Sequence, residues 1–175
     1  MAEIAAAIAR VKSVLQRRPE MGLHDDVPVT ARWQHSTRVV AAHPNGKEVA
    51  TDMPGELGGS GDQVSPGWLF RAGLASCTAT TIAMNAAAEG IEITALEVKV
   101  GSRTDSRGFL GMSDDAGQPI YAGPGNLAME VRIAAKGVAE ERLRAFVRQC
   151  YVQSPIPNAV ENTTPMALQI EIEAA

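Results

Sequence analysis

Two cysteines are the residues of this chain best suited to redox chemistry. Cys77 lies in the stretch LASCTATT, and Cys150 lies four residues before Ser154-Pro155 in RQCYVQSPIPNA. Two thiols can form a disulfide only when their Cα atoms lie about 4.4–6.8 Å apart. Unpaired cysteine is also among the residue types most often buried in protein cores. The two cysteines therefore indicate either a redox pair or two packing residues.

A reactive Cys77 would need a cation close to its sulfur. The thiolate is the nucleophile, and an ordinary thiol with a pKa of about 8.5 is mostly protonated at neutral pH. Ser65-Pro66 is typical of a helix start, which puts Cys77 about three turns into the helix. The helix dipole acts mainly on the first turn, so it cannot activate this thiol. Without a cation, an apolar environment would make Cys77 inert.

The other candidate residues carry weaker signals. His24, His35 and His43 have no cysteine or histidine at metal-ligand spacing, so we expect no metal site. Ser154 has no general base in its own segment, and a serine before proline is ordinary at a helix end. Trp68, at the start of the predicted central helix, indicates either the lining of a pocket beside Cys77 or a core or interface aromatic.

Length and charge exclude several classes of protein. The 175 residues are enough for one compact unit with a core. A formal charge of −4 argues against a nucleic-acid binder, which needs a clustered basic face. Two cysteines are too few for a secreted disulfide scaffold. We expect a cytoplasmic protein with no cofactor, no nucleic-acid partner and no membrane association.

The N-terminal stretch is predicted to form an amphipathic helix followed by a linker, together residues 1–27. Glu3, Arg10 and Lys12 interrupt it, which is unlike a signal peptide. A mitochondrial presequence is an alternative to a surface helix, and we favour the surface helix. Such a helix would dock through four apolar side chains: Ile4, Ile8, Val11 and Leu15.

The remaining pattern predicts an α+β fold. Alternating apolar residues indicate strands and 3.6-residue periodicity indicates helices. Pro44-Asn45-Gly46 is predicted to turn the second strand into the third. The predicted strands are 29–34, 36–43, 47–52, 92–103, 126–137 and 166–174, and the predicted helices are 66–89 and 138–154.

The helix at 66–89 has apolar or small residues on every face. One twisted sheet cannot cover such a helix in a chain of this size. We therefore predict an obligate homodimer with this helix at its centre. Met84, Met129 and Met166 are expected to fill the core.

Four stretches, taken in order, resemble the OsmC/Ohr family of osmotically inducible and organic-hydroperoxide-resistance proteins. They are TDMPGELGG, SPGWLFRAGLASCTATT, GIEITALEVKVGSRTDSRG and SPIPNAV, and the resemblance spans roughly residues 30–173. It implies an OsmC-like domain at 28–175, with an antiparallel six-stranded sheet wrapping two long central helices. It also implies an intertwined homodimer, to which residues 1–27 add an extra helix.

The resemblance further implies a peroxiredoxin-like thiol peroxidase of the oxidative-stress response, which reduces organic hydroperoxides and is re-reduced by dithiols. Cys77 matches the peroxidatic cysteine. The family arginine on an early strand corresponds to Arg38, with Arg32 as the alternative. The family glutamate at the start of the first central helix is absent. The family resolving cysteine before proline is replaced by Ser154.

Cys150 is the remaining candidate for the resolving thiol. Its displacement by four helical residues amounts to about 6 Å, which favours a packing role. Trp68 and Ser154 are candidates for substrate contact. Three hypotheses follow: a thiol peroxidase acting through Cys77, a non-enzymatic protein that binds a small apolar or thiol-bearing ligand in the dimer cleft, and a different Cys77-dependent enzyme.

Overall fold

The computed structural model describes residues 2–162 and 164–173, and it has the α+β class predicted from the sequence. Five strands and five α-helices are the regular elements of this part of the chain. The helices are α1 (Ala2–Arg17), α2 (Pro66–Glu89), α3 (Ser106–Phe109), α4 (Glu140–Val152) and α5 (Pro155–Glu161), with 3-10 turns η1 (Pro19–Gly22) and η2 (Gly55–Leu57).

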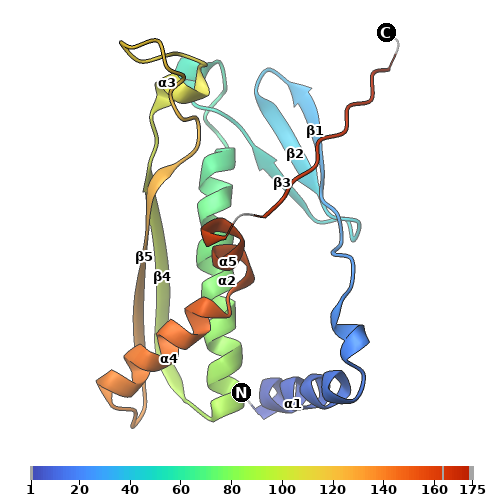
Figure 1. The fold of residues 1–175 in the computed structure, drawn as a ribbon, viewed down its shortest axis with the longest axis vertical. Coiled ribbons are helices and arrows are strands. Elements are labelled where there is room, and N and C mark those ends of the chain that lie inside the picture. Colours follow the sequence, from blue (N-terminus) through green and yellow to red (C-terminus); the bar gives the residue numbers. More distant parts are fainter. Residues whose placement is uncertain (1, 163, 174–175) are drawn as a thin grey trace.

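The long helix α2 begins and ends as the sequence predicts. The Trp68 N–H donates to the Ser65 side-chain oxygen at 3.2 Å, and Pro66 occupies the first helical position. Gly90 closes the helix in the left-handed conformation, with φ of 69°, which costs glycine nothing. The 24 residues between these ends form one unbroken rod through the molecule (Figure 1).

The strands form two separate antiparallel sheets. One contains β1 (Thr30–His35), β2 (Arg38–Ala42) and β3 (Glu48–Thr51), and the other pairs β4 (Ile93–Arg103) with β5 (Gly125–Ala135). The predicted turn between β2 and β3 is confirmed, because the His43 N–H donates to the Lys47 carbonyl across Gly46, which has φ of 84°. Figure 1 shows α2 between the two sheets.

The core lies where α2 packs between the β4–β5 pair and α4. Ile82 and Ala86 of α2 contact a buried cluster that also contains Ile91, Leu143, Phe146 and Cys150. The other side of α2 is open within one chain, since Phe70 is 37% exposed and Met84 is 45% exposed. One chain therefore leaves part of this helix uncovered, as expected from its apolar faces, and Met84, which was expected in the core, is exposed in the single chain.

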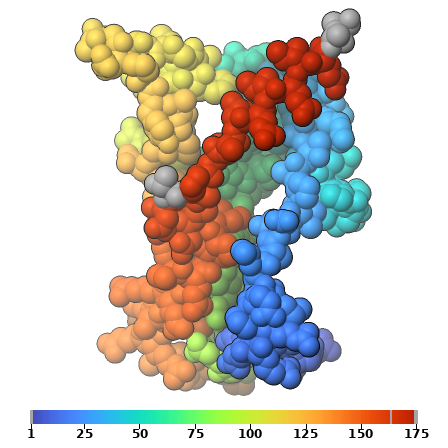
Figure 2. Space-filling view, turned by 45° about the vertical axis from the view of Figure 1, so that its right-hand side comes forward, coloured from blue at the N-terminus to red at the C-terminus, as the bar shows by residue number. Residues whose placement is uncertain are grey.

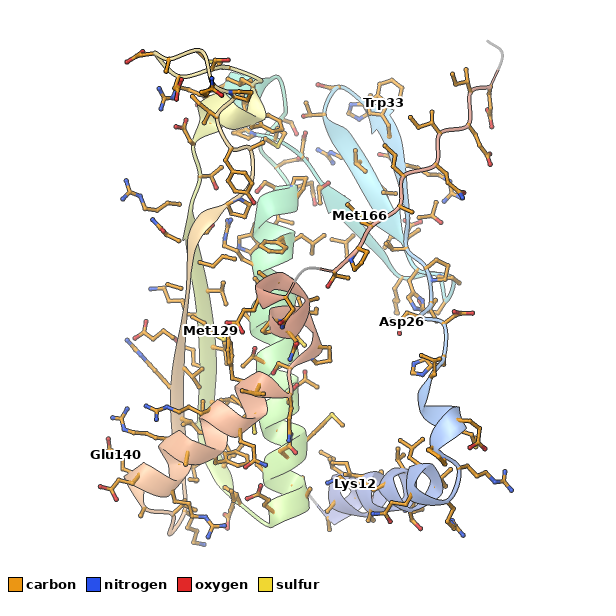
Figure 3. The ribbon with its side chains drawn as sticks, in the orientation of Figure 1. Lys12, Asp26, Trp33, Met129, Glu140 and Met166 are labelled. Carbon is orange, nitrogen blue, oxygen red and sulfur yellow. The ribbon has the colours of Figure 1, made fainter. Side chains whose placement is uncertain are left out.

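The predicted six-stranded sheet is also not formed by one chain, which has five strands in two sheets over its described residues. The predicted strand at 166–174 is not formed in the single chain as far as it is described, because 164–173 carries no strand. A strand requires a neighbour to pair with, and this segment has none in the chain. Figure 2 shows the segment crossing the face of the molecule, and Figure 3 labels Met166 on it, which is exposed instead of buried.

The N-terminal helix α1 packs beside α2 (Figure 1). Two of its predicted docking residues, Ile8 and Leu15, are half-buried, whereas Ile4 and Val11 are exposed. The buried apolar face expected for a docked amphipathic helix is therefore only partly present. The division of the chain at residue 28 stays a prediction.

The loop between β3 and α2 folds back so closely that Gly59 has no room for a side chain. A Cβ atom there would lie 1.8 Å from the Met53 carbonyl oxygen. We expect Gly59→Ala to lower the free energy of unfolding by about 1–3 kcal/mol, because the backbone must move to admit the methyl group. Gly55→Ala is the control, since nothing lies within 4 Å of its added Cβ. Equal urea-unfolding midpoints for the two variants would contradict the close packing of this loop.

Candidate functional site

Cys77 lies at the border between the buried and exposed sides of α2. Thr78, the next residue, is fully buried, and Ser76, the preceding residue, is exposed. The Cys77 sulfur is half-buried and accepts a hydrogen bond from the backbone N–H of Ile156 at 3.5 Å. A donor at this position stabilises negative charge on sulfur, and the thiolate is the form that attacks a peroxide.

Pro155 is the reason that Ile156 reaches the thiol. It cannot continue α4, so the chain turns after Val152 and starts the short helix α5 at Pro155. The buried Ser154 hydroxyl stabilises this turn by donating to the Cys150 carbonyl at 2.9 Å. The sequence pattern marked Pro155 as the end of a helix but did not reveal α5 or the role of Ile156. The only available signal was the Ser-Pro start, which is the same as that of α2.

Cys150 is in the core cluster and not beside the Ile156 amide. It is fully buried against Ile82 and Ala86, which lie about one and a half to two and a half turns after Cys77 on α2. Burial, reinforced by the negative charge of Glu89, raises the pKa of the Cys150 thiol to about 11. Both cysteines are free thiols. Cys150 therefore has the environment of an unreactive packing residue.

Arg38 is engaged by acidic side chains and not by the thiol. Its guanidinium donates to Asp52 at 3.1 Å and to the Ser60 hydroxyl at 3.0 Å, and it forms an ion pair with Asp62. None of the hydrogen bonds or ion pairs of Arg38 within the described residues reaches Cys77. Arg32, the alternative, lies on the exposed strand β1. Among the described residues, neither arginine therefore forms a hydrogen bond with the Cys77 thiol.

Asp52 organises this cluster and was missed by the sequence analysis. Its carboxylate is 3% exposed and accepts hydrogen bonds from Ser60, from Thr37 at 2.5 Å and from the Met53 N–H at 2.8 Å. These hydrogen bonds, led by that of the Ser60 hydroxyl, hold the pKa of Asp52 far below its usual value. The signal that could have found it is an aspartate directly after a strand, followed by a Ser-Gly-Asp loop.

Trp68 does not share a recorded cavity with Cys77. It is half-exposed and lines a cavity of about 180 Å³ together with Arg71, Ala72, Ala75 and Val100. This cavity faces β4, on the side of α2 away from Ile156. Trp68 is therefore neither a buried core residue nor a neighbour of the thiol.

A second cavity of about 260 Å³ is lined by chain neighbours of Cys77 and Ile156, although by neither of these two residues themselves. Leu74, one turn before Cys77 on α2, and Pro157, next to Ile156 on α5, both line it. Figure 3 shows Met129 of β5 on the side of the strand that faces α2 and α5. The remaining lining residues are Val100, Leu127, Ala128, Tyr151, Val160 and Glu161. The cavity is thus mostly apolar, and one polar pair, the Tyr151 hydroxyl donating to Glu161 at 2.5 Å, lies in its wall.

The structure reveals no candidate metal centre among the residues that it describes. In that part of the chain, no group of three or more histidine, cysteine, aspartate or glutamate side chains lies close enough together to bind one metal ion. Asp52 and Asp62, the closest approach to an acidic site, already share the guanidinium of Arg38.

Comparison with known proteins identifies the family. The model of OsmC-like proteins matches residues 59–169, which is more than half of the chain and includes both α2 and α5. The chain belongs to the OsmC-like protein family. The comparison with curated proteins gave no match.

Solved structures share the fold of this OsmC-like protein. An OsmC-like protein from Mycoplasma pneumoniae is 18% identical, with a TM-score of 0.66 over 81% of this chain and 91% of its own. The organic hydroperoxide resistance protein OsmC of Legionella pneumophila is 19% identical, with a TM-score of 0.55 over 79% and 90%. The organic hydroperoxide resistance protein OhrB of Bacillus subtilis is 20% identical, with a TM-score of 0.50 over 79% and 93%.

The geometry predicts which thiol position can pair with Cys77. Position 154 lies two residues from the amide that touches the Cys77 sulfur, whereas Cys150 lies in the core. We expect one equivalent of peroxide to leave the native chain without a Cys77–Cys150 disulfide. The double variant Cys150→Ser with Ser154→Cys should instead form an intramolecular disulfide, detected by mass spectrometry of non-reduced peptides.

The single variant Cys150→Ser is the control for this experiment, because it keeps Cys77 and adds no thiol. Linked Cys77–Cys150 peptides from the native chain would show that the core opens enough to bring the two thiols together, contrary to this prediction.

Proposed function

We propose that this OsmC-like protein is a thiol-dependent peroxidase that reduces organic hydroperoxides through Cys77. The observation that carries the proposal is the Cys77 sulfur, which is half-buried and in contact with the Ile156 N–H, while the nearby residues Leu74 and Pro157 line an apolar cavity. Family membership supports a hydroperoxide-related role. The neighbours from Legionella pneumophila and Bacillus subtilis are organic hydroperoxide resistance proteins by name.

The chemistry needs one thiolate and one external dithiol. The Cys77 thiolate attacks the terminal oxygen of ROOH, the O–O bond breaks, and the departing alkoxide takes a proton to become ROH. The sulfur is oxidised to sulfenic acid. A dithiol then attacks the sulfenic sulfur, releases water and leaves a mixed disulfide, which its second thiol resolves to regenerate the Cys77 thiol. No cofactor takes part in either step.

The surroundings of the thiol support the first step in two ways. The Ile156 N–H stabilises the thiolate by a charge-assisted hydrogen bond, a role that Arg38 does not fill while two carboxylates hold it. The cavity beside Leu74 and Pro157 offers apolar surface for the organic group of the hydroperoxide. Trp68 and Ser154 do not contact this space, so we assign substrate contact to the cavity wall instead.

The proposal predicts a peroxide reaction that depends on one sulfur. The protein should consume cumene hydroperoxide and t-butyl hydroperoxide with dithiothreitol as reductant, and Cys77→Ser should reduce the rate to that of buffer. Ser76→Ala is the matched control, since it changes the adjacent, exposed side chain and leaves the sulfur in place. A rate no faster than buffer for the native protein, with Cys77 confirmed as reduced, would refute the peroxidase proposal.

A non-enzymatic binding role is the second candidate. The position of Cys150 in the core and the engagement of Arg38 by Asp52 and Asp62 favour it, because both remove groups on which the family chemistry depends. Binding of an apolar molecule that persists in Cys77→Ser, without peroxide turnover in the native chain, would support this role. The third hypothesis, a different Cys77-dependent enzyme, has no observation of its own in its favour.

We also propose that the protein is an intertwined homodimer in which a second copy completes a six-stranded sheet. The exposed side of α2 and the unpaired segment 164–173 support this, since both expose apolar side chains that a partner would cover. Met166, Leu168, Ile170 and Ile172 alternate along that segment and are 75–95% exposed. Such alternation is typical of a strand with one buried face.

The dimer has a direct test in solution. Sedimentation at micromolar concentration should give twice the mass of one chain, and Ile170→Lys should shift the protein toward monomer by placing a charge on the covered face. Glu171→Lys, on the opposite face of the segment, is the control for the added charge. A folded monomer of the native chain at that concentration would exclude an obligate dimer.

We propose a cytoplasmic location, where reducing conditions keep both free thiols reduced. Among the described residues, none of the helices combines the length and the apolar character that crossing a bilayer requires.

A further inference from the structure

Arg71 is a half-buried cation without an acidic partner among the described residues. Its guanidinium makes one recorded hydrogen bond, from Nη1 to the neutral Ser102 hydroxyl at 3.3 Å. The eight ion pairs in the described part of the chain all involve other basic side chains. A guanidinium has five N–H donors in a planar fork that matches a carboxylate. Most of this donor capacity is unused by the protein.

The cavity beside Arg71 has the size and lining for a small apolar group. It measures about 180 Å³, and a cavity of about 150 Å³ is large enough to hold a benzene ring. Ala72, Ala75 and Val100 provide apolar walls, and Trp68 adds a half-exposed indole one turn from Arg71. A flat or compact hydrocarbon body would therefore have aromatic and aliphatic surface on several sides.

Gly67 leaves space open next to the cation. A Cβ atom added to this glycine would lie 3.7 Å from Arg71 Nη1, and the other neighbouring atom is the Ser65 hydroxyl oxygen at 4.0 Å. A carboxylate in this space would meet the guanidinium directly. A long side chain at position 67 would extend into the same space, so the glycine keeps the approach to Arg71 open.

We propose that Arg71, Trp68 and the cavity walls form a binding site for a small carboxylic acid with an aromatic or compact aliphatic body. The carboxylate pairs with the Arg71 guanidinium, and the hydrocarbon body fills the cavity against Trp68 and Val100. The site lies on the β4 side of α2, whereas Cys77 contacts α5, so it is separate from the thiol and does not depend on the proposed peroxidase activity.

The fluorescence of Trp68 provides the test. The chain has two tryptophans, so the variant Trp33→Phe leaves Trp68 as the only reporter. Trp33 is exposed on β1 and does not line the cavity, so we expect this substitution to leave the fold and the cavity unchanged. Titration with benzoate should change the emission of Trp68 with saturation in the millimolar range. Benzamide, which has the same shape without the charge, should bind at least about tenfold more weakly.

Two variants in this background test the role of the cation. Arg71→Gln should weaken benzoate binding about tenfold or more, while benzamide binding stays the same. Gly67→Glu places a tethered carboxylate beside Arg71 and should reduce benzoate binding to a similar extent. Gly67→Ala is its control and should bind as the parent does, since its Cβ makes only an ordinary contact.

The outcomes separate this site from the thiol. Cys77→Ser in the same background should bind benzoate with unchanged affinity whether or not the native protein consumes peroxide. Circular dichroism that matches the parent establishes that each variant is folded. Equal binding of benzoate and benzamide, or unchanged benzoate binding in Arg71→Gln or Gly67→Glu, would overturn the proposal.

Discussion

The continuous backbone hydrogen bonding of α2 sets where the side chains of both candidate sites can lie. A straight helix of 24 residues fixes both the distance and the angle between its side chains. Leu74, Thr78, Ile82 and Ala86 form the stripe that is buried against the β4–β5 pair and α4. With that stripe anchored, Cys77 must lie at its border and Arg71 must point toward β4. The thiol and the guanidinium therefore belong to two separate sites by the geometry of one helix.

The turn between α4 and α5 is the second determinant of the thiol site. Pro155 ends one helix and begins another, and the displaced chain brings an amide, not a side chain, to the Cys77 sulfur. A backbone N–H is held rigidly by the helix start, but it carries no full charge. Redox chemistry at Cys77 would accordingly use one protein sulfur, and the second thiol would come from an external reductant.

The carboxylates of Asp52 and Asp62 hold the Arg38 guanidinium within one chain. Arg38 has the position along the chain that the family resemblance assigns to a catalytic arginine, yet Asp52 and Asp62 neutralise it. A buried carboxylate with four hydrogen-bond donors stays ionised at neutral pH, so its attraction for the guanidinium persists there. The same contacts fix the glycine-rich loop, so Arg38 links this loop to the end of β3 within one chain.

Elements with local signals could be predicted from the order of the residues. Ser65-Pro66 and Gly90 define the ends of α2 because capping depends on neighbouring backbone groups, and Pro44-Asn45-Gly46 defines a turn for the same reason. The four stretches that resemble the OsmC/Ohr family could be recognised for a similar reason, since each is a continuous run of residues and their order is given by the chain. The distance of about 6 Å between Cys150 and the family position at Ser154 likewise followed from the rise per residue of a helix.

The contacts between these elements could not be predicted in the same way, because they form between segments that are distant in the chain. Whether residues 166–173 form a strand depends on pairing with a sheet edge, and no local pattern shows that this segment pairs with none of the edges in its own chain. The partners of Arg38 come from a loop more than ten residues away, and Ile156 lies 79 residues from Cys77. The cavity at Arg71 exists because β4 runs beside α2 and brings Val100 and Ser102 next to this side chain. Contacts between distant segments follow from packing, which the order of residues in one segment does not specify.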